Sequence, residues 1–323
     1  MRQYRIPVFI PHEGCPNDCV FCNQKKITGV TTTMTPEQAK LDITEQLRYL
    51  PQEKCQIEIA FFGGSFTGIP LEKQEEFYRV ADEFRPRIDG IRLSTRPDYI
   101  NDEVLYLAKQ WGVSTIELGA QSASDEVLNK NRRGHTFAQT VAAVKQIRGA
   151  GIGVGLQMMT GMYGSSPEKD RTTAQELAKL QPDCVRIYPV LVLKDTALAH
   201  LHREGLYQPQ TMEEAIETAK EVLKVFRKKQ IPVIRLGLHA GEELREEGVV
   251  LAGPFHPAFG ELVESRIYRD SMVAKLEEYS QMPKVFEFSA EQDQISKVVG
   301  HGRCNAVYLK EKYGVTLKVK VCS

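Results

Sequence analysis

Three of the chain's seven cysteines stand within eight residues of one another near the N-terminus. Cys15, Cys19 and Cys22 have the spacing C-x3-C-x2-C, and they follow the short apolar run 6–10. Thiols clustered in one loop are more often metal ligands than disulfide partners in a reducing compartment, and the total number of cysteines is odd. The spacing therefore predicts a metal centre in the loop after the first strand.

Two kinds of metal centre fit this loop, and the residues alone leave both open. Zinc prefers four tetrahedral ligands, and His12 could supply the fourth, although structural zinc sites usually gather two separated ligand pairs. Three thiolates with no fourth cysteine nearby instead suit a [4Fe–4S] cluster with one iron left for an outside ligand. The third alternative is that the thiols bind no metal.

Short runs rich in β-branched residues alternate along the chain with longer amphipathic stretches. This alternation predicts a series of βα units, and therefore a parallel sheet that is either open or closed into a barrel. One predicted helix, 35–50, opens with Thr, Pro and acidic residues, and another, 136–151, ends at glycine. The predicted strands are 6–10, 56–62, 90–95, 114–120, 153–159, 184–190 and 231–236.

The alternation of strands and helices loosens after about residue 240. We therefore expect a (β/α) barrel domain at residues 1–240 and a small α+β appendage at residues 241–323. The fold class is α/β, a partial or full TIM-like barrel with about six to seven parallel strands. In the appendage the predicted elements are a helix at 256–279, a strand at 284–288, a helix at 303–314 and a strand at 316–321.

Glycines and polar residues end several of the predicted strands, which is where a barrel enzyme carries its chemistry. Gly63, Gly64 and Ser65 end the second strand, and glycine lets a ligand approach the backbone closely. The third strand ends with 94–96, and the fourth ends with 117–122. Polar side chains there need a partner or a ligand, although tight turns and helix capping explain some of them without any function.

These motifs together resemble the radical S-adenosylmethionine (SAM) superfamily. The resemblance rests on the cysteine spacing after a first strand, on Phe21 before the last cysteine, and on the glycine segment about forty residues later. The chain is also similar to the radical SAM domain of the Elongator catalytic subunit family, whose members modify wobble uridines of tRNA. That similarity runs from about residue 5 to about residue 238, and it includes the segments 131–136, 158–170, 185–198 and 205–215.

The resemblance implies a [4Fe–4S] cluster and S-adenosyl-L-methionine as cofactors, with an external one-electron donor such as flavodoxin or ferredoxin. Reductive cleavage of SAM would give a 5′-deoxyadenosyl radical that abstracts hydrogen from a substrate. By position, Cys15, Cys19 and Cys22 would bind the cluster. The residues implied to contact SAM or to lie beside it are Phe21, Gly63, Gly64, Ser65, Thr95, Arg96, Gln121, Ser122, Met159, Gly161, Tyr188 and Pro189.

An RNA substrate is expected only through the family resemblance. Lys and Arg together number 42, as do Asp and Glu, so no overall charge draws the chain toward nucleic acid. A small-molecule or protein substrate is the alternative, and a zinc-binding module without catalysis is a third hypothesis. The basic residues expected near the mouth of the barrel, where phosphates could bind, are Lys25, Lys26, Lys130, Arg132 and Arg133.

The chain departs from the family's pattern at both ends. Members that make carboxymethyl-type uridine carry a basic region before the cluster and an acetyltransferase-like domain after it. Here the first cysteine is residue 15, and the appendage is too short for a complete acetyltransferase fold, although 297–309 is similar to an acetyl-CoA pyrophosphate turn. The resemblance therefore covers the radical half of the family's reaction.

We expect a cytoplasmic protein with no membrane partner. The N-terminus lacks the apolar core of a secretory signal. No later stretch approaches the roughly 18 to 20 apolar residues that a membrane span needs.

Overall fold

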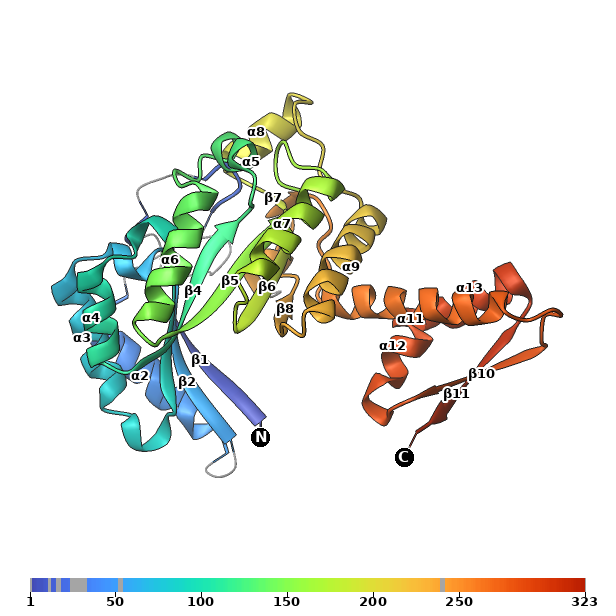
Figure 1. Ribbon diagram of the computed structural model, residues 1–323, viewed down its shortest axis with the longest axis horizontal. Coiled ribbons are helices and arrows are strands. Elements are labelled where there is room, and N and C mark those ends of the chain that lie inside the picture. The colour runs from blue at the N-terminus through green and yellow to red at the C-terminus, as the bar shows by residue number, and fades with distance from the viewer. Residues whose placement is uncertain are drawn as a thin grey trace.

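The structure is a computed structural model, and it describes residues 2–10, 13–15, 19–23, 34–51, 55–238 and 242–322. Seven strands form one sheet in the order β1-β2-β3-β4-β5-β6-β8, and all six neighbouring pairs are parallel (Figure 1). The sheet is curled but open, so the α/β prediction is confirmed as a partial barrel. The strands are β1 (Arg2–Ile10), β2 (Cys55–Gly63), β3 (Gly90–Thr95), β4 (Val113–Gln121), β5 (Gly153–Thr160), β6 (Cys184–Pro189) and β8 (Val233–Leu236).

Helices connect the strands, and polar side chains begin several of them. Thr35 caps α2 by accepting a hydrogen bond from the backbone of Gln38, and Thr136 with Gln139 forms a capping box at α6. No helix in the described ranges is both long and apolar enough to cross a membrane. The helices are α2 (Pro36–Arg48), α3 (Leu71–Asp82), α4 (Asp102–Gln110), α5 (Asp125–Lys130), α6 (Phe137–Gly149), α7 (Pro167–Lys179), α8 (Ala197–Arg203) and α9 (Met212–Lys228).

The two faces of the sheet differ in composition. Because side chains alternate along a strand, each strand presents one set of residues to the helices of the main core and the other set to the opposite, inner face. The outer set is apolar and forms the main core with the helices, with Ile59, Phe61 and Leu93 fully buried. The inner face carries Arg5, Glu58, Arg92, Glu117, Arg186 and Arg235, which are buried or partly buried.

The C-terminal segment builds a second, smaller core. Strands β10 (Val285–Ala290) and β11 (Thr316–Val321) pair in parallel, and they pack with α11 (Phe259–Glu277), α12 (Ile295–Val299) and α13 (Cys304–Tyr313). The strands and helices expected there are confirmed. The division of the chain at residues 240 and 241 stays a prediction.

Helix α11 runs from beside α9 to the C-terminal strands (Figure 1). Near its start, Phe259 and Val263 pack against α9, whereas Met272 and Leu276 pack in the C-terminal core. Before it, the charged stretch 242–252 forms α10 (Glu242–Arg245) and β9 (Val250–Ala252). Strand β9 pairs antiparallel with β7 (Val192–Leu193), a long-range contact that the sequence did not indicate.

Candidate active site

The loop that carries the cysteines is held by segments that follow two other strands. The backbone N–H of Val20 donates to the carbonyl oxygen of Asn131 at 3.3 Å, and its own carbonyl accepts from the N–H of Leu198 at 2.7 Å. The Val20 side chain is buried in an apolar cluster with Val127, Met162 and Leu198, and Phe21 packs against that cluster. The segments that follow β4 and β6 therefore fix the part of the loop between Cys19 and Cys22.

Arg133 lies inside the protein beside one of the three cysteines. Its Nη1 donates to Sγ of Cys19 at 3.1 Å, and its Nη2 donates to the carbonyl oxygen of Gly119 at 2.8 Å. Cys19 and Arg133 are both buried. The side chain that the sequence suggested for RNA phosphates is thus placed against a sulfur atom of the cysteine loop.

The glycine segment after β2 packs against the start of the cysteine loop. A Cβ atom added to Gly64 would lie 2.1 Å from the carbonyl oxygen of Glu13, and one on Gly14 would lie 2.1 Å from that of Ser65. Gly63 has φ +119°, a backbone conformation in which a residue with a side chain would be strained. The backbone N–H of Ser65 donates to the carbonyl oxygen of Glu13 at 3.0 Å. These glycines are therefore needed for one backbone to approach another.

Side chains at the ends of β2 and β3 bond to one another. The hydroxyl of Thr95 lies 2.7 Å from that of Ser65 and 2.6 Å from that of Thr67. The backbone N–H of Arg96 donates to the Ser65 hydroxyl, and its guanidinium donates twice to Asp98, at 3.0 and 2.8 Å. Ser65, Thr95 and Arg96 are buried. Their polar groups join the strand ends into one network.

Gln121 ends β4 in a left-handed conformation, with φ 62°, which is uncommon for a residue with a side chain. It is buried, and its Oε1 has no hydrogen-bond partner among the described residues. A Cβ on Gly119 would lie 3.0 Å from Gln121 Nε2 and 3.3 Å from Arg133 Nη2, so the amide neighbours the guanidinium that contacts the cysteine loop. The next residue, Ser122, instead bonds to Thr173 at 3.3 Å.

The remaining residues expected near the cofactor lie at the ends of β5 and β6. Met159 and Tyr188 are register partners on the inner face, and both are partly buried. Pro189 pairs with Thr160 and is buried. Gly161, which follows β5, has φ 72° and accepts a hydrogen bond from the hydroxyl of Tyr207 at 2.7 Å.

Two titratable groups near these strand ends have pKa values that are shifted in opposite directions. Burial lowers the pKa of His135 to about 4, helped by the charge of Arg133, and its Nε2 lies 3.3 Å from the carbonyl oxygen of Ala120. Burial raises the pKa of Asp170 to about 6, against the hydrogen bonds that it accepts from the Ser165 hydroxyl and the Gly161 N–H. His135 is therefore favoured as the neutral imidazole, and Asp170 is favoured in its protonated form up to about pH 6.

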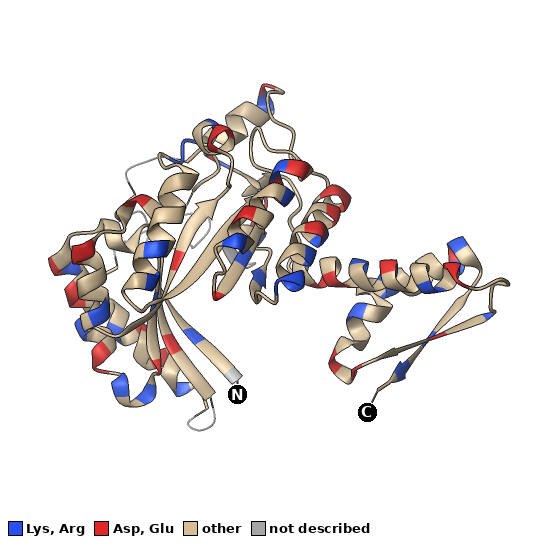
Figure 2. Cartoon of the chain, viewed as in Figure 1, with Lys and Arg blue, Asp and Glu red and all other residues tan. Residues whose placement is uncertain are grey.

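The basic residues expected at the mouth have different surroundings. Lys130 is exposed and pairs with Glu126 at 2.8 Å, a carboxylate that also pairs with Lys169. Arg132 is exposed. Lys25 and Lys26 lie outside the described residues. Basic and acidic residues are interspersed along the helices, α9 included (Figure 2). Of the five basic residues expected at the mouth, Lys130 and Arg132 are the two that the structure describes as exposed.

The donor chemistry of the loop fits an iron–sulfur cluster. The loop offers the three sulfur atoms of Cys15, Cys19 and Cys22, and Arg133 joins that of Cys19 to the carbonyl oxygen of Gly119 on β4. No three His, Cys, Asp or Glu side chains of the described residues stand close enough together to hold a metal ion as they are. The fit therefore rests on the kind of ligand, on the charged hydrogen bond at Cys19, and on the Oε1 of Gln121, which has no hydrogen-bond partner among the described residues.

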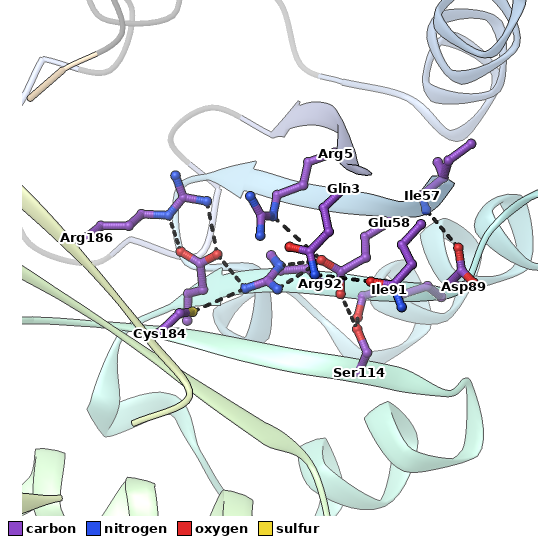
Figure 3. Close-up of polar contacts among 12 residues, drawn as sticks. Gln3, Arg5, Ile57, Glu58, Asp89, Ile91, Arg92, Ser114, Cys184 and Arg186 are labelled. Atoms are coloured by element: carbon purple, nitrogen blue, oxygen red, sulfur yellow. Dashed lines mark hydrogen bonds and ion pairs between the residues drawn. The ribbon is translucent and has the colours of Figure 1, made fainter. Parts of the chain in front are cut away.

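A network of charged residues crosses the inner face below this site (Figure 3), and the sequence analysis did not single it out. Glu117 accepts from Arg186 at 2.5 and 3.1 Å and from Nη1 of Arg92 at 2.9 Å. Arg92 also donates to Glu58 at 3.0 Å. The sequence feature that could have revealed this network is a single charged residue within an otherwise largely apolar strand, as in "QIEIAFF" and "GIRLST".

Comparison with protein families decides which kind of barrel this is. The radical SAM superfamily matches residues 9–177, which include the cysteine loop and strands β2 to β5. The chain belongs to the radical SAM superfamily. Members of this superfamily are enzymes. A second family, the radical SAM C-terminal domain, matches residues 182–269. The resemblance inferred from the cysteine and glycine motifs is thus confirmed.

Relatives of this radical SAM chain include tRNA-modifying proteins. A tRNA uridine(34) acetyltransferase of Methanocaldococcus jannaschii is 30% identical over 253 residues, which are 66% of this chain and 47% of the relative. Elongator complex protein 3 of Schizosaccharomyces pombe is 25% identical over 292 residues, with 73% and 53% covered. The chain spans about half the length of these curated relatives.

A solved structure shares the fold of this radical SAM chain. The archaeal Methanocaldococcus infernus Elp3 with an N-terminal deletion superposes with a TM-score of 0.66 at 24% identity, covering 83% of this chain and 63% of that one. The similarity to the Elongator Elp3 family, predicted from the motifs, is thus found in both sequence and fold.

Proposed function

We propose that Cys15, Cys19 and Cys22 hold a [4Fe–4S] cluster, that SAM binds beside it, and that the enzyme modifies RNA, tRNA in particular. When bound, the cluster would deliver one electron that cleaves SAM to the 5′-deoxyadenosyl radical. The electron would come from an external donor such as a flavodoxin or a ferredoxin, in the cytoplasm, where clustered thiols stay reduced.

The contact between Arg133 and Cys19 carries this proposal. A buried guanidinium costs free energy unless a negative partner compensates it, and Arg133 has its Nη1 on a sulfur atom. Such a hydrogen bond suits a sulfur that bears negative charge, as a metal-bound thiolate does. Arg133 would therefore orient Cys19 and neutralise part of its charge.

Other residues at the edge would bind SAM and exclude water. The Oε1 of Gln121 is buried without a partner among the described residues, so it is suited to accept a hydrogen bond from a hydroxyl or amino group of SAM. Val20 and Phe21 close the loop with an apolar cluster, and Met159 and Tyr188 flank the inner side. An apolar enclosure protects a reactive radical from side reactions with solvent.

The RNA part of the proposal is supported by the relatives. Two relatives that match at 30% and 25% identity are named for tRNA uridine(34) acetylation and for the Elongator complex, but this chain spans about half of their length. Lys130 and Arg132 are exposed near the same edge, where they are suited to meet phosphates.

The first experiment tests the cluster through its iron and sulfide content. In anaerobically purified protein we expect Cys15→Ser, Cys19→Ser and Cys22→Ser each to lose most of the iron and sulfide. Cys55→Ser is the matched control, because Cys55 begins β2 away from the loop, and it should keep the wild-type content. One zinc per chain with little iron in the wild type would contradict the proposal.

The second experiment tests the substrate. Wild-type protein reduced with dithionite is incubated with SAM and total tRNA, and the nucleosides are analysed by mass spectrometry. We expect 5′-deoxyadenosine and a new or altered nucleoside, both absent with Cys19→Ser. Release of 5′-deoxyadenosine with no change in any nucleoside and no retention of tRNA at low salt would contradict the RNA substrate while leaving the radical chemistry in place.

A further inference from the structure

The inner face of the sheet carries more positive than negative charge. Four arginines and two glutamates lie on this face of the seven described strands, and they are Arg5, Arg92, Arg186, Arg235, Glu58 and Glu117. Guanidinium groups removed from water need negative partners, because desolvation of an uncompensated charge is costly. Arginines therefore outnumber glutamates on this face of the described strands.

The two carboxylates of the face are already engaged by other groups. Both oxygens of Glu117 accept from Arg186, and one also accepts from Arg92. Glu58 accepts from Arg92 at 3.0 Å through one oxygen and from the hydroxyl of Ser114 at 2.8 Å through the other. Every carboxylate oxygen of these two glutamates therefore already accepts a hydrogen bond from another group, and Arg5 has to share Glu58 with Arg92 and Ser114.

Arg5 is the arginine that this arrangement leaves least compensated. Its Nε lies 3.6 Å from Glu58, beyond hydrogen-bond distance, and is buried without a hydrogen-bond partner among the described residues. Burial first, and then the positive charges of Arg92 and Arg186, lower the pKa of Arg5. Figure 3 shows its guanidinium beside the groups of Arg92 and Arg186.

Flat apolar groups line the same face nearer the carboxyl edge. The rings of Phe9 and Phe62 have centroids 6.4 Å apart, and the guanidinium of Arg186 lies 5.2 Å from the centroid of Phe62. Phe9 stands four residues beyond Arg5 on β1, about 13 Å along the strand. An arginine side chain and a ligand of nucleotide size together cover that span.

We infer that the inner face binds an organic anion, with a planar ring against Phe9 and Phe62 and a carboxylate or phosphate on the guanidinium of Arg5. As a statement about the enzyme's substrate this rests on the proposed function, whereas the binding itself needs neither cluster nor SAM. Arginine suits both kinds of anion because its planar fork matches their oxygens.

The test is isothermal titration calorimetry on the wild-type full chain with three uracil derivatives. Orotate carries a carboxylate, uridine 5′-monophosphate carries a phosphate, and uridine is neutral. We expect at least one of the two anions to bind about tenfold or more tightly than uridine, and the tighter one identifies the anionic group. Equal affinity for all three, or no binding of either anion, would overturn the inference.

Two substitutions should change this affinity in opposite directions. Arg5→Gln should weaken binding of the preferred anion about tenfold, to the level of uridine. Glu58→Gln should strengthen it severalfold, because Gln keeps the bond to Ser114 but removes a negative charge beside Arg5. Arg79→Gln, on the outside of α3 and paired with Glu75, is the matched control and should change nothing.

A structural role alone would not produce opposite signs. If Arg5→Gln and Glu58→Gln both weaken binding, or neither changes it, the anion does not sit on Arg5. Arg5→Lys keeps the charge and should retain preference for the anion over uridine even if Arg5→Gln folds poorly. Because the titration uses no reductant, a negative result leaves the iron content and SAM cleavage unaffected, so the two proposals fail separately.

Discussion

The two faces of the central sheet are stabilised by different interactions, although the same strands form both. On the outer face, Ile59, Phe61 and Leu93 are fully buried against helices and stabilise the fold by removing apolar surface from water. On the inner face, Arg92 and Glu117 are also buried, but each needs its partners to offset desolvation.

The comparison shows how a parallel sheet can hold a polar site. Parallel strands are usually apolar on both faces, because helices cover both. Here helices cover one face, and the alternate residues of β1 to β4, β6 and β8 include one charged residue each. Substitutions on the two faces should therefore destabilise the protein for different reasons, and the following predictions separate these reasons.

The largest effect is expected on the outer face. Phe61 is fully buried and packs against Phe66, Phe77 and Tyr78, with centroids 5.0 to 6.3 Å away. Phe61→Ala should lower the free energy of unfolding by about 3–5 kcal/mol, measured by urea denaturation. Phe62→Ala changes the next residue, which points to the inner face and is partly exposed, and it should cost less than half as much. Equal costs would mean that the two faces are not packed differently.

The next effect is expected where the inner face is most tightly paired. Glu117→Gln leaves Arg92 and Arg186 without their shared carboxylate, which should lower the free energy of unfolding by about 3 kcal/mol. This is the lower end of the range for breaking a buried pair, since the amide oxygen still accepts a hydrogen bond. Glu126→Gln, at an exposed carboxylate, should have no measurable effect. A loss below about 1 kcal/mol for Glu117→Gln would mean that water already solvates the network.

Smaller, pH-dependent effects are expected at the strand ends above both faces. The pKa of His135 falls to about 4 in the folded state, so the unfolded chain binds more protons between pH 6.5 and 4 and stability is lost as the pH falls. From pH 7 to pH 5 this costs about 2 kcal/mol. The pKa of Asp170 rises to about 6, so its contribution is lost as the pH rises through the same window.

These two contributions partly cancel in the wild type, and single variants should reveal each. Asp170→Asn should make stability fall more steeply from pH 7 to pH 5, whereas His135→Gln should make it rise over that range. Urea denaturation at both pH values measures the difference. If both variants keep the wild-type dependence, neither group titrates as its burial implies.

The smallest effect is expected at the least compensated member of the inner face. Arg5→Gln removes a charge whose nearest carboxylate is 3.6 Å away, so the free energy of unfolding should change by less than about 1 kcal/mol. Arg92→Gln, which breaks contacts with two glutamates, should cost at least about 2 kcal/mol. Similar costs for both would contradict the view that Arg5 is kept for a ligand.

Much of the fold was predictable because local pattern and sheet agree. All seven predicted strands are present, the limits 90–95 and 316–321 agree to the residue, and Thr35 and Thr136 cap the helices expected after them. The place of the cysteine loop followed from the rule that parallel strands end at one edge. Cys184 is buried, as its place at the start of a strand suggested.

What the sequence could not show depends on distant partners. Arg133 looked like a surface residue in "NRRGHT", but the turn after α5 directs it to Cys19, 114 residues earlier in the chain. Strands β7 and β9 are too short for periodicity to reveal them. From the sequence, Gly64 suggested the close approach of a ligand, whereas in the structure Gly64 lies against the backbone of Glu13. Tertiary contacts decided each of these.

Helix α11 sets a limit on how the chain can be shortened. Its 19 residues span about 28 Å, and its first turn covers the open edge of the sheet, where Phe259 lies over Gly237. Deleting the C-terminal lobe by cutting before this helix would therefore expose β8 and one side of α9 to solvent. A trimmed protein that ends at Glu264 would keep the contacts of Phe259 and Val263, whereas one that retains the whole helix would also expose Met272 and Leu276 to solvent.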